Sequence, residues 1–272
     1  MRSLAETAAK GRARIMAAAL AFSAGVLSAA EDYIAIDVSG GTNSGKYRVE
    51  RFTAAPKGGW GDDAKTTKIV LRLVPGERQF YIGVFEVTQR QYELVTGSNP
   101  SAWRGHMNPV ECVSFDSIRG VGDKPADDSF IGVLRRKTGL PLDLPTDAEW
   151  ERACRAGGDG EWGAYEATEL SQIARYACDV GDGRGEGRRH VAVGLYAPNA
   201  WGLYDMYGNV FEWCLDMYSD FMPPAMRKKG DSRRVLRGGS WYSHFTGCKA
   251  RHCCEPGMAD VFYGFRLKCQ VE

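Results

Sequence analysis

The high glycine content limits the folds open to this chain more than any other property of its sequence. Of its 272 residues, 33 are glycine, and the glycines occur at no regular interval. An average protein contains about 7% glycine. An excess without a period excludes collagen and solenoids and favours a fold with many tight turns. After Gly158, glycine and aromatic residues are interleaved to the carboxyl end. The sequence therefore predicts an α+β fold with much irregular backbone.

The overall composition is that of a globular protein. Hydrophobic residues make up 44% and charged residues 25% of the chain, which excludes general disorder and a membrane bundle. The 35 Lys+Arg and 34 Asp+Glu leave a net charge of +1, so no nucleic-acid partner is expected. No linker divides Tyr33 to Glu272, and we expect residues 31–272 to form a single domain.

The first 30 residues have the pattern of a signal peptide. Four basic residues precede the apolar run Ile15 to Leu27, and Ser28 to Ala30 supply small residues at a cleavage site. A buried helix or a short anchor is the alternative, although the run is shorter than the roughly 20 residues that span a bilayer. We expect no transmembrane segment in the mature chain and an exported protein in the cell envelope, on the cell surface or secreted. Export permits disulfides among the eight cysteines, whose connectivity spacing alone does not fix.

Local signals predict several elements in the amino-terminal half. Lys68 to Leu73 and Gln79 to Phe85 alternate and are rich in β-branched or aromatic residues, which indicates two strands. Thr88 and Gln91 form a capping box, and Gly97 ends the helix that follows.

Two further helices are expected before Gly158. Asp127 or Asp128 is predicted to cap a helix that ends at Gly139. Thr146 and Glu149 form a second capping box and begin the other helix.

Seven phrases together, over roughly residues 66 to 269, resemble the sulfatase-modifying factor family. This family comprises the formylglycine-generating enzymes and their relatives, and its domain has a C-type-lectin-like fold, which the resemblance implies here. The phrases occur in the family's order at Phe80–Thr88, Gly97–Pro100, Leu144–Glu151, Pro198–Asp205, Gly208–Trp213, Arg237–Trp241 and Gly264–Arg266.

The resemblance also implies where a catalytic copper would bind. Formylglycine-generating enzymes hold copper with two thiolates five residues apart, and these positions are Ser243 and Cys248 here. A hydroxyl is a hard ligand and does not replace a thiolate on Cu(I). We therefore predict no copper and no catalysis. The alternative is a copper-dependent oxidase that converts a peptidyl cysteine to formylglycine, with Cys253 or Cys254 supplying sulfur in a rearranged site.

By the same resemblance, a structural calcium site would use Asp205, Gly208, Val210 and Glu212. Oxygen ligands within eight residues suit calcium. The alternative is that Asp205 caps a turn and Glu212 pairs with a buried arginine.

The stretch from about residue 238 to 267 resembles the variable region of one branch of the family. These are the target proteins of diversity-generating retroelements, such as the treponemal variable protein, in which template adenines are randomised. When the adenines of an asparagine codon are altered in this way, the new codon can encode any of the residues that we predict to bind the ligand. They are Tyr242, Ser243, His244, Phe245, Thr246, Gly247, His252, Cys253, Cys254, Ala259, Asp260, Val261 and Phe262.

This mixture of residues suits a binding surface. Aromatic side chains give contact area at low entropic cost, and short polar side chains give adaptable hydrogen bonds, as in antibody paratopes. Trp241 is expected to be a core anchor. Cys253 or Cys254 pairs with Cys248 or Cys269, or stays a free thiol. The sequence thus predicts an exported, non-enzymatic protein with a diversified face for a macromolecular ligand, most simply a protein.

Overall fold

The computed structural model describes residues 31–163, 173–176, 189–226, 229–243 and 247–271. Glu31–Glu272 forms one compact unit. The predicted signal peptide, residues 1–30, lies outside the described residues, as do His244, Phe245 and Thr246. Within the described ranges, no helix combines the length and apolarity needed to span a membrane.

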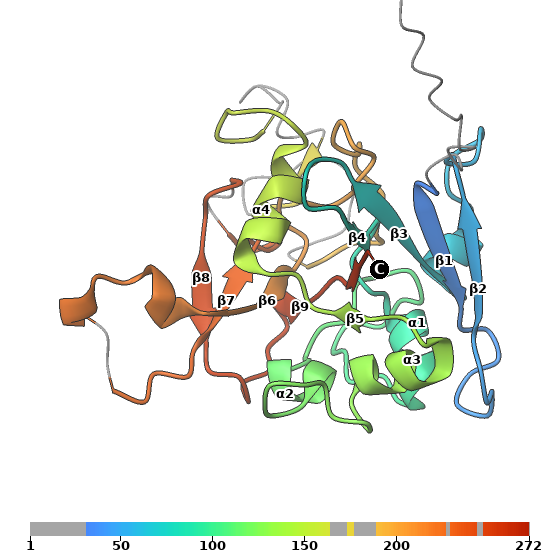
Figure 1. Ribbon diagram of the computed structural model, residues 1–272, viewed down its shortest axis with the longest axis horizontal. Coiled ribbons are helices and arrows are strands. Elements are labelled where there is room, and N and C mark those ends of the chain that lie inside the picture. Colours follow the sequence, from blue (N-terminus) through green and yellow to red (C-terminus); the bar gives the residue numbers. More distant parts are fainter. Residues whose placement is uncertain (1–30, 164–172, 177–188, 227–228, 244–246, 272) are drawn as a thin grey trace, which may run out of the picture. The chain divides into compact units, whose positions relative to one another are not determined.

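A six-stranded antiparallel sheet has the order β2-β1-β3-β4-β10-β5 (Figure 1). The last strand, β10, lies between β4 and β5, so the end of the chain completes a sheet begun at its start. The strands are β1 (Tyr33–Asp37), β2 (Arg48–Phe52), β3 (Lys68–Val74), β4 (Phe80–Gly83), β5 (Leu142–Asp143) and β10 (Lys268–Gln270). The two strands predicted from the sequence are β3 and β4.

The structure places four short α-helices between residues 31 and 157. They are α1 (Gln89–Thr96), α2 (Phe115–Arg119), α3 (Phe130–Thr138) and α4 (Asp147–Arg155). The capping boxes at Thr88 and Thr146 are both present, and α1 ends at Gly97 as predicted.

The predicted cap of α3 is wrong. Ser129, not Asp127 or Asp128, accepts the hydrogen bond from the Gly132 backbone at 3.1 Å. The Ser129 backbone N–H also donates to the Ala126 carbonyl, which places both aspartates inside a tight turn before the helix. The helix ends at Gly139 as predicted.

The second sheet has four strands in the order β8-β7-β6-β9, with β6 and β9 parallel. Figure 1 shows it in orange and red beside α4. Its strands are β6 (Phe211–Met217), β7 (Arg234–Arg237), β8 (His252–Cys254) and β9 (Tyr263–Gly264). Short 3-10 turns occupy η1 (Asp62–Lys65), η4 (Tyr218–Phe221) and η5 (Pro224–Met226).

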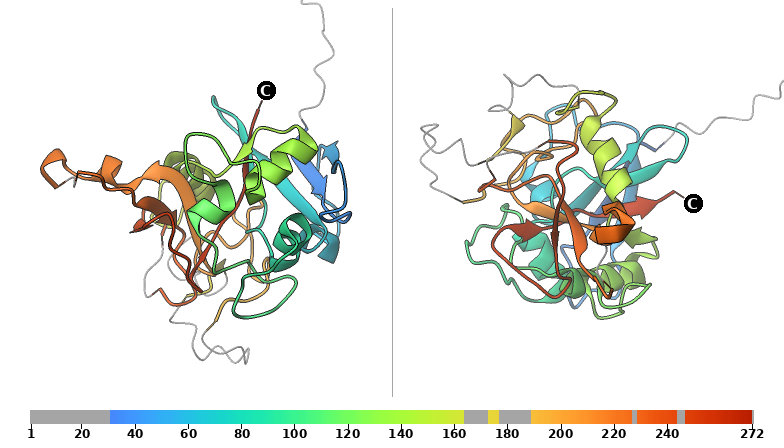
Figure 2. Two further views of the ribbon diagram at one scale, coloured as in Figure 1. Left: turned by 90° about the horizontal axis from the view of Figure 1, so that it is seen from below. Right: turned by 90° about the vertical axis from the view of Figure 1, so that its left-hand side faces the viewer.

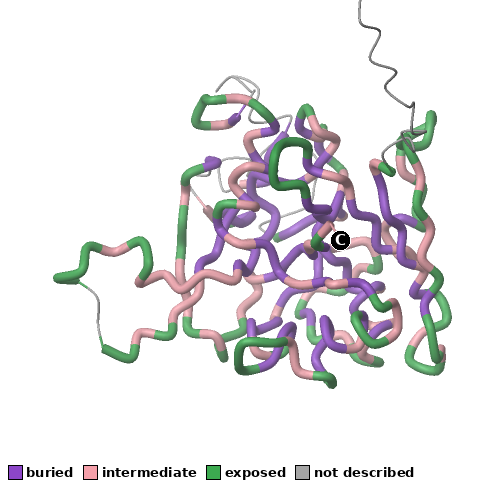
Figure 3. The backbone as a smooth tube through the Cα atoms, viewed as in Figure 1, coloured by how far each residue is buried: buried purple, intermediate pink, exposed green. Residues whose placement is uncertain are grey.

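Buried side chains fill the space between these elements. One cluster joins the six-stranded sheet to α1 and α3 and includes Tyr92, Phe130 and Phe265. A second lies against α4 and includes Trp150 and Tyr207. Figure 3 shows the buried backbone in purple through both sheets, with exposed green backbone mainly in the connections. Figure 2 shows the β6–β7 connection projecting from the second sheet.

Candidate functional site

A buried ion pair ties the two sheets together beneath the carboxyl-terminal loops. Arg266 Nε and Nη2 each donate to one carboxylate oxygen of Glu212 at 2.6 Å, and both side chains are fully buried. Trp150 Nε1 donates to the same carboxylate at 2.7 Å. Arg266 also donates to the carbonyl of Gly83 at 3.0 Å, which connects β4 to the second sheet. This bidentate geometry strongly fixes both groups.

Two more buried carboxyl groups lie close to this pair. Glu86 accepts hydrogen bonds from Asn209 Nδ2 at 2.6 Å and from the Val210 backbone at 3.1 Å. Asp205 Oδ2 accepts one from the Gly194 backbone at 2.7 Å, while Oδ1 is buried without a hydrogen-bond partner. Burial raises the pKa of Asp205 to about 6. Burial and then the charge of Asp205 raise the pKa of Glu86 well above its usual value.

The side chains as they lie do not fit the calcium site predicted for Asp205, Gly208, Val210 and Glu212. Both oxygens of Glu212 are engaged by Arg266, which is the ion-pair alternative that the sequence left open. Within the described ranges, no group of three or more His, Cys, Asp or Glu is arranged to hold a metal. Calcium binding stays a prediction.

A second buried arginine holds the segment after β7 against α4. Arg237 Nε lies 2.6 Å from Asp147 Oδ1, and its Nη2 donates to Glu151 at 2.6 Å. Its Nη1 donates to the carbonyl of Cys248 at 2.7 Å. Arg251 donates to Asp147 at 2.8 Å. The chain on both sides of the first predicted binding residues, 242–247, is therefore fixed to α4.

An aromatic cluster forms the base of the predicted binding region. Trp241 packs edge-on against Trp103 at 5.2 Å between ring centroids and lies 5.1 Å from Phe262. Tyr242 lies 5.7 Å from Phe262 and is 50% exposed. Trp241 is only 8% exposed, and its backbone N–H donates to Asn209. The expectation that Trp241 anchors the loop is confirmed.

Ser243 closes the turn that presents Tyr242. Its hydroxyl accepts a hydrogen bond from the Ser240 backbone at 2.9 Å, and its own backbone N–H donates to the Ser240 carbonyl at 2.9 Å. The hydroxyl at the family's first thiol position is thus part of the local turn.

The other loop is attached to the scaffold by its backbone. The carbonyl of Asp260 accepts hydrogen bonds from the Cys112 backbone at 2.9 Å and from Tyr263 at 3.1 Å. The Phe211 backbone N–H donates to the Phe262 carbonyl at 2.7 Å. These bonds fix the loop while leaving Ala259 exposed and Val261 half-buried.

Strand β8 adds a second group of predicted binding residues at the edge of the four-stranded sheet. His252 is exposed, and its ring is tilted against that of Phe211 with 5.2 Å between the ring centroids. Partial burial lowers the pKa of His252, so the imidazole is neutral near pH 7. Burial raises the pKa of the Cys253 thiol, which is therefore protonated. Cys254 is half-buried.

We use "display face" for the described loop residues Tyr242, Ser243 and 259–262 together with β8. All of these residues are exposed or half-buried. Gly247 is the exception among the predicted contacts that the structure describes, because it is buried. A Cβ there would lie 3.3 Å from Glu161 Cγ, so this position packs against residue 161.

Cys248 lies beside a cysteine that the sequence did not suggest as its partner, and Cys253 and Cys254 are free thiols, one of the alternatives left open. The Cys248 sulfur lies 3.1 Å from that of Cys154 on α4, whereas Cys253 contacts Arg233 at 3.5 Å. Both Cys154 and Cys248 are buried. The spacing of cysteines gave no signal for this contact, which joins residues 94 positions apart.

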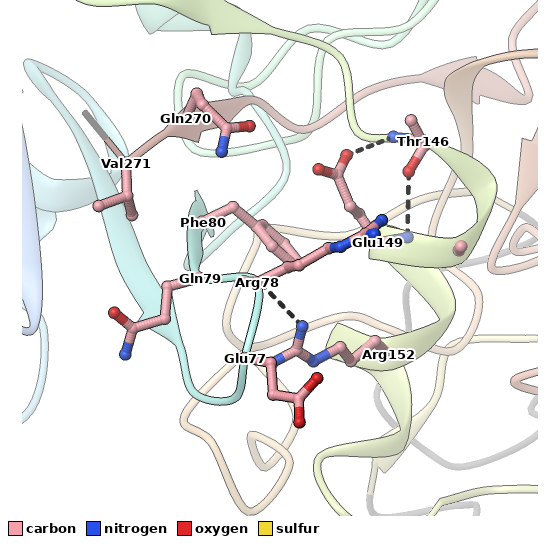
Figure 4. A pocket seen from close by; sticks show the side chains of 10 residues that line it. Glu77, Arg78, Gln79, Phe80, Thr146, Glu149, Arg152, Gln270 and Val271 are labelled. Atoms are coloured by element: carbon pink, nitrogen blue, oxygen red, sulfur yellow. Dashed lines mark hydrogen bonds between the residues drawn. The ribbon is translucent and has the colours of Figure 1, made fainter.

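Two open grooves lie along α4. The first, of about 670 Å³, is lined by residues including Phe80, Thr146 and Arg152, and Figure 4 shows that its polar side chains partly serve the helix cap and the β3–β4 turn. The second, of about 630 Å³, is lined by residues including Trp201, Phe221 and Arg251. Neither is lined by residues of the display face.

Comparisons with known proteins agree with this architecture. Residues 74–271 match the family described as the sulfatase-modifying factor enzyme 1-like domain. The formylglycine-generating enzyme of Thermomonospora curvata is 37% identical over 148 residues, covering 45% of this chain and 48% of that protein. The mouse protein named inactive C-alpha-formylglycine-generating enzyme 2 is 37% identical over 135 residues, covering 45% and 41%. The family thus includes active and inactive members.

Among solved structures, Treponema denticola variable protein 1 superimposes with a TM-score of 0.60 and 25% identity, covering 75% of this chain and 96% of that one. The chain spans between about a fifth and three quarters of the length of the first curated relatives it matches. Since the family match runs from the last residue of β3 through β10 and covers more than half of the chain, the chain belongs to the sulfatase-modifying factor family and has its C-type-lectin-like fold.

Proposed function

We propose that this protein is an exported, non-enzymatic binding protein whose display face holds a macromolecular ligand. The observation that carries the proposal is Tyr242, half exposed above a buried Trp241 and beside Phe262. An aromatic side chain on a fixed base loses little entropy on binding, which is the usual character of an interface hot spot. Likeness to a variable protein supports the same reading.

The ligand class follows from the chemistry of the face. His252 is neutral at pH 7, and Tyr242 and Phe262 add aromatic rings that lie 5.7 Å apart. A surface with aromatic anchors and short polar groups suits another protein better than a polyanion. The balanced charge of the chain supports this choice.

The thiol geometry supports a non-enzymatic role. The Ser243 hydroxyl is used by its turn, and the Cys248 sulfur faces the buried Cys154. A peptidyl cysteine would have to reach Cys248 through packed side chains. The competing function, a copper-dependent oxidase, gains a second sulfur from Cys154, but both sulfurs belong to buried residues within the part of the chain that the structure describes.

Binding is tested with Tyr242→Ala and Phe262→Ala together. The probe is a partner isolated by cross-linking through a photoreactive group placed at Ala259, and its affinity is then measured with purified components. We expect the double variant to lose at least about 30-fold in affinity, the effect of one strong hot spot. Phe221→Ala, which changes an exposed aromatic on η4, is the matched control and keeps the affinity. Unchanged affinity in the double variant would refute the proposed face.

Two further measurements separate the alternatives. A near-copy of the coding sequence for residues 238–267, differing at adenines beside a reverse transcriptase gene, is expected if the face is diversified. Stoichiometric Cu(I) binding with oxygen uptake on a cysteine-containing peptide would instead establish the oxidase.

Amino-terminal sequencing of the mature protein tests export, with Glu31 as the expected first residue.

A further inference from the structure

Cys154 and Cys248 bring two thiols together at the base of the display face. Cys154 lies in the last turn of α4, and Cys248 lies in the segment between β7 and β8. Their sulfur atoms are 3.1 Å apart, and both residues are at most 1% exposed.

The backbone around both cysteines is held in place. The Cys248 N–H donates to the Glu161 carbonyl at 2.8 Å, and its carbonyl accepts from the buried Arg237 at 2.7 Å. The Tyr207 hydroxyl lies 3.2 Å from the Cys248 sulfur and 3.3 Å from the Cys154 carbonyl. A disulfide bond is about 2.05 Å long, so closing the gap needs a side-chain movement of about 1 Å.

We propose that Cys154 and Cys248 form a disulfide that fastens the display segment to α4. The oxidant is a small-molecule or protein disulfide, as exported proteins encounter. The Cys248 thiolate attacks one sulfur of the oxidant, giving a mixed disulfide and releasing one thiol. The Cys154 thiolate then attacks the Cys248 sulfur, which forms the new bond and releases the second thiol. Two protein thiols are oxidised, and one disulfide is reduced to two thiols.

The bond would form during folding, before packing excludes the oxidant from both sulfurs. It would constrain a loop of more than 90 residues, so its removal is expected to lower thermal stability. It would also hold the base of the display face in position however the exposed side chains vary. Cys214 offers a matched comparison because it is equally buried, and its sulfur contacts the Glu212 carbonyl at 3.9 Å.

Mass mapping tests the bond directly. The protein is refolded in a glutathione redox buffer, alkylated without reduction and digested. We expect one linked peptide pair containing Cys154 and Cys248, and a gain of two hydrogen masses at this pair on reduction. The pair persists in Cys214→Ser and disappears in Cys154→Ser. Recovery of both cysteines as alkylated monomers from folded wild-type protein would overturn the proposal, as would a link from Cys248 to Cys253 or Cys254.

Thermal unfolding supplies an independent readout. Reduction is expected to lower the midpoint of wild type and Cys214→Ser by roughly 5–10 °C and to leave Cys248→Ser unchanged. Equal sensitivity of Cys248→Ser to reduction would contradict the assignment. The peptide map requires no ligand, so its result is separate from that of the binding experiment.

Discussion

Glu212→Gln removes the negative charge of a buried ion pair while keeping nearly the same shape. Arg266 then loses a bidentate partner at 2.6 Å in a fully buried site. Removing one partner of such a pair costs about 3–5 kcal/mol. Asp205 remains nearby and attracts Arg266. We therefore expect the lower end, about 3 kcal/mol of unfolding free energy, or roughly 6–12 °C in melting temperature for a domain of this size.

Thermal unfolding followed by circular dichroism measures this loss. Glu50→Gln is the control, because its ion pair with Arg48 at 3.1 Å is largely exposed and contributes less than about 1 kcal/mol. Addition of about 1 mM calcium, the working range of extracellular modules, distinguishes the two roles of Glu212. A melting temperature of Glu212→Gln within about 2 °C of wild type would refute the structural role. A calcium-dependent rise in wild type that the variant lacks would instead make Glu212 a ligand.

Three further perturbations test the scaffold. Asp205 has a pKa of about 6 in the folded state, against an ordinary value of 3.8. Between pH 3.8 and pH 6 the folded protein therefore binds more protons than the unfolded protein. The contribution of Asp205 to stability should therefore fall as the pH rises from about 4 to about 6. Asp205→Asn should remove this contribution, which melting curves across that pH range will measure. The same dependence of melting temperature on pH in the variant and the wild type would contradict this assignment. Trp241→Ala is expected to cost about 3–5 kcal/mol in chemical denaturation, and Tyr242→Ala less than about 1 kcal/mol, since only the first is buried; equal losses would argue against an exposed Tyr242. Gly208→Ala places a Cβ 1.8 Å from the Arg175 carbonyl oxygen and should lower the soluble yield sharply. Gly230→Ala, with a similar positive φ but open space, should cost only about 1–2 kcal/mol; similar yields for both glycine variants would show that the Gly208 contact is relaxed.

Hydrogen bonds between residues close together in the chain explain which helix ends could be predicted from the sequence. Thr88 with Gln91 and Thr146 with Glu149 each place a hydroxyl and a longer side chain three residues apart, and both boxes form. Helix α2 was missed, because its box pairs Ser114 with Ser117 and the helix has only five residues. The wrong cap of α3 has a similar origin, since three consecutive residues from Asp127 to Ser129 are all good caps and only the fold selects one.

The candidate site was predictable in part. The order of the family phrases located the region between Arg237 and Gly264, and the structure leaves most of its described predicted contacts exposed or half-buried. The burial of Gly247 was not predictable, because it depends on contact with residue 161.

The sequence by itself determined the family, both ends of α1, the start of α4 and the stretch that lies on the display face. Those signals come from side chains a few residues apart, so they act before the chain closes. Only the tertiary structure decided that Glu212 meets Arg266, that Ser243 serves a turn and that Cys248 meets Cys154. The Glu212 and Cys248 partners lie 54 and 94 residues away in the chain, and packing of α4 and the two sheets brings them together.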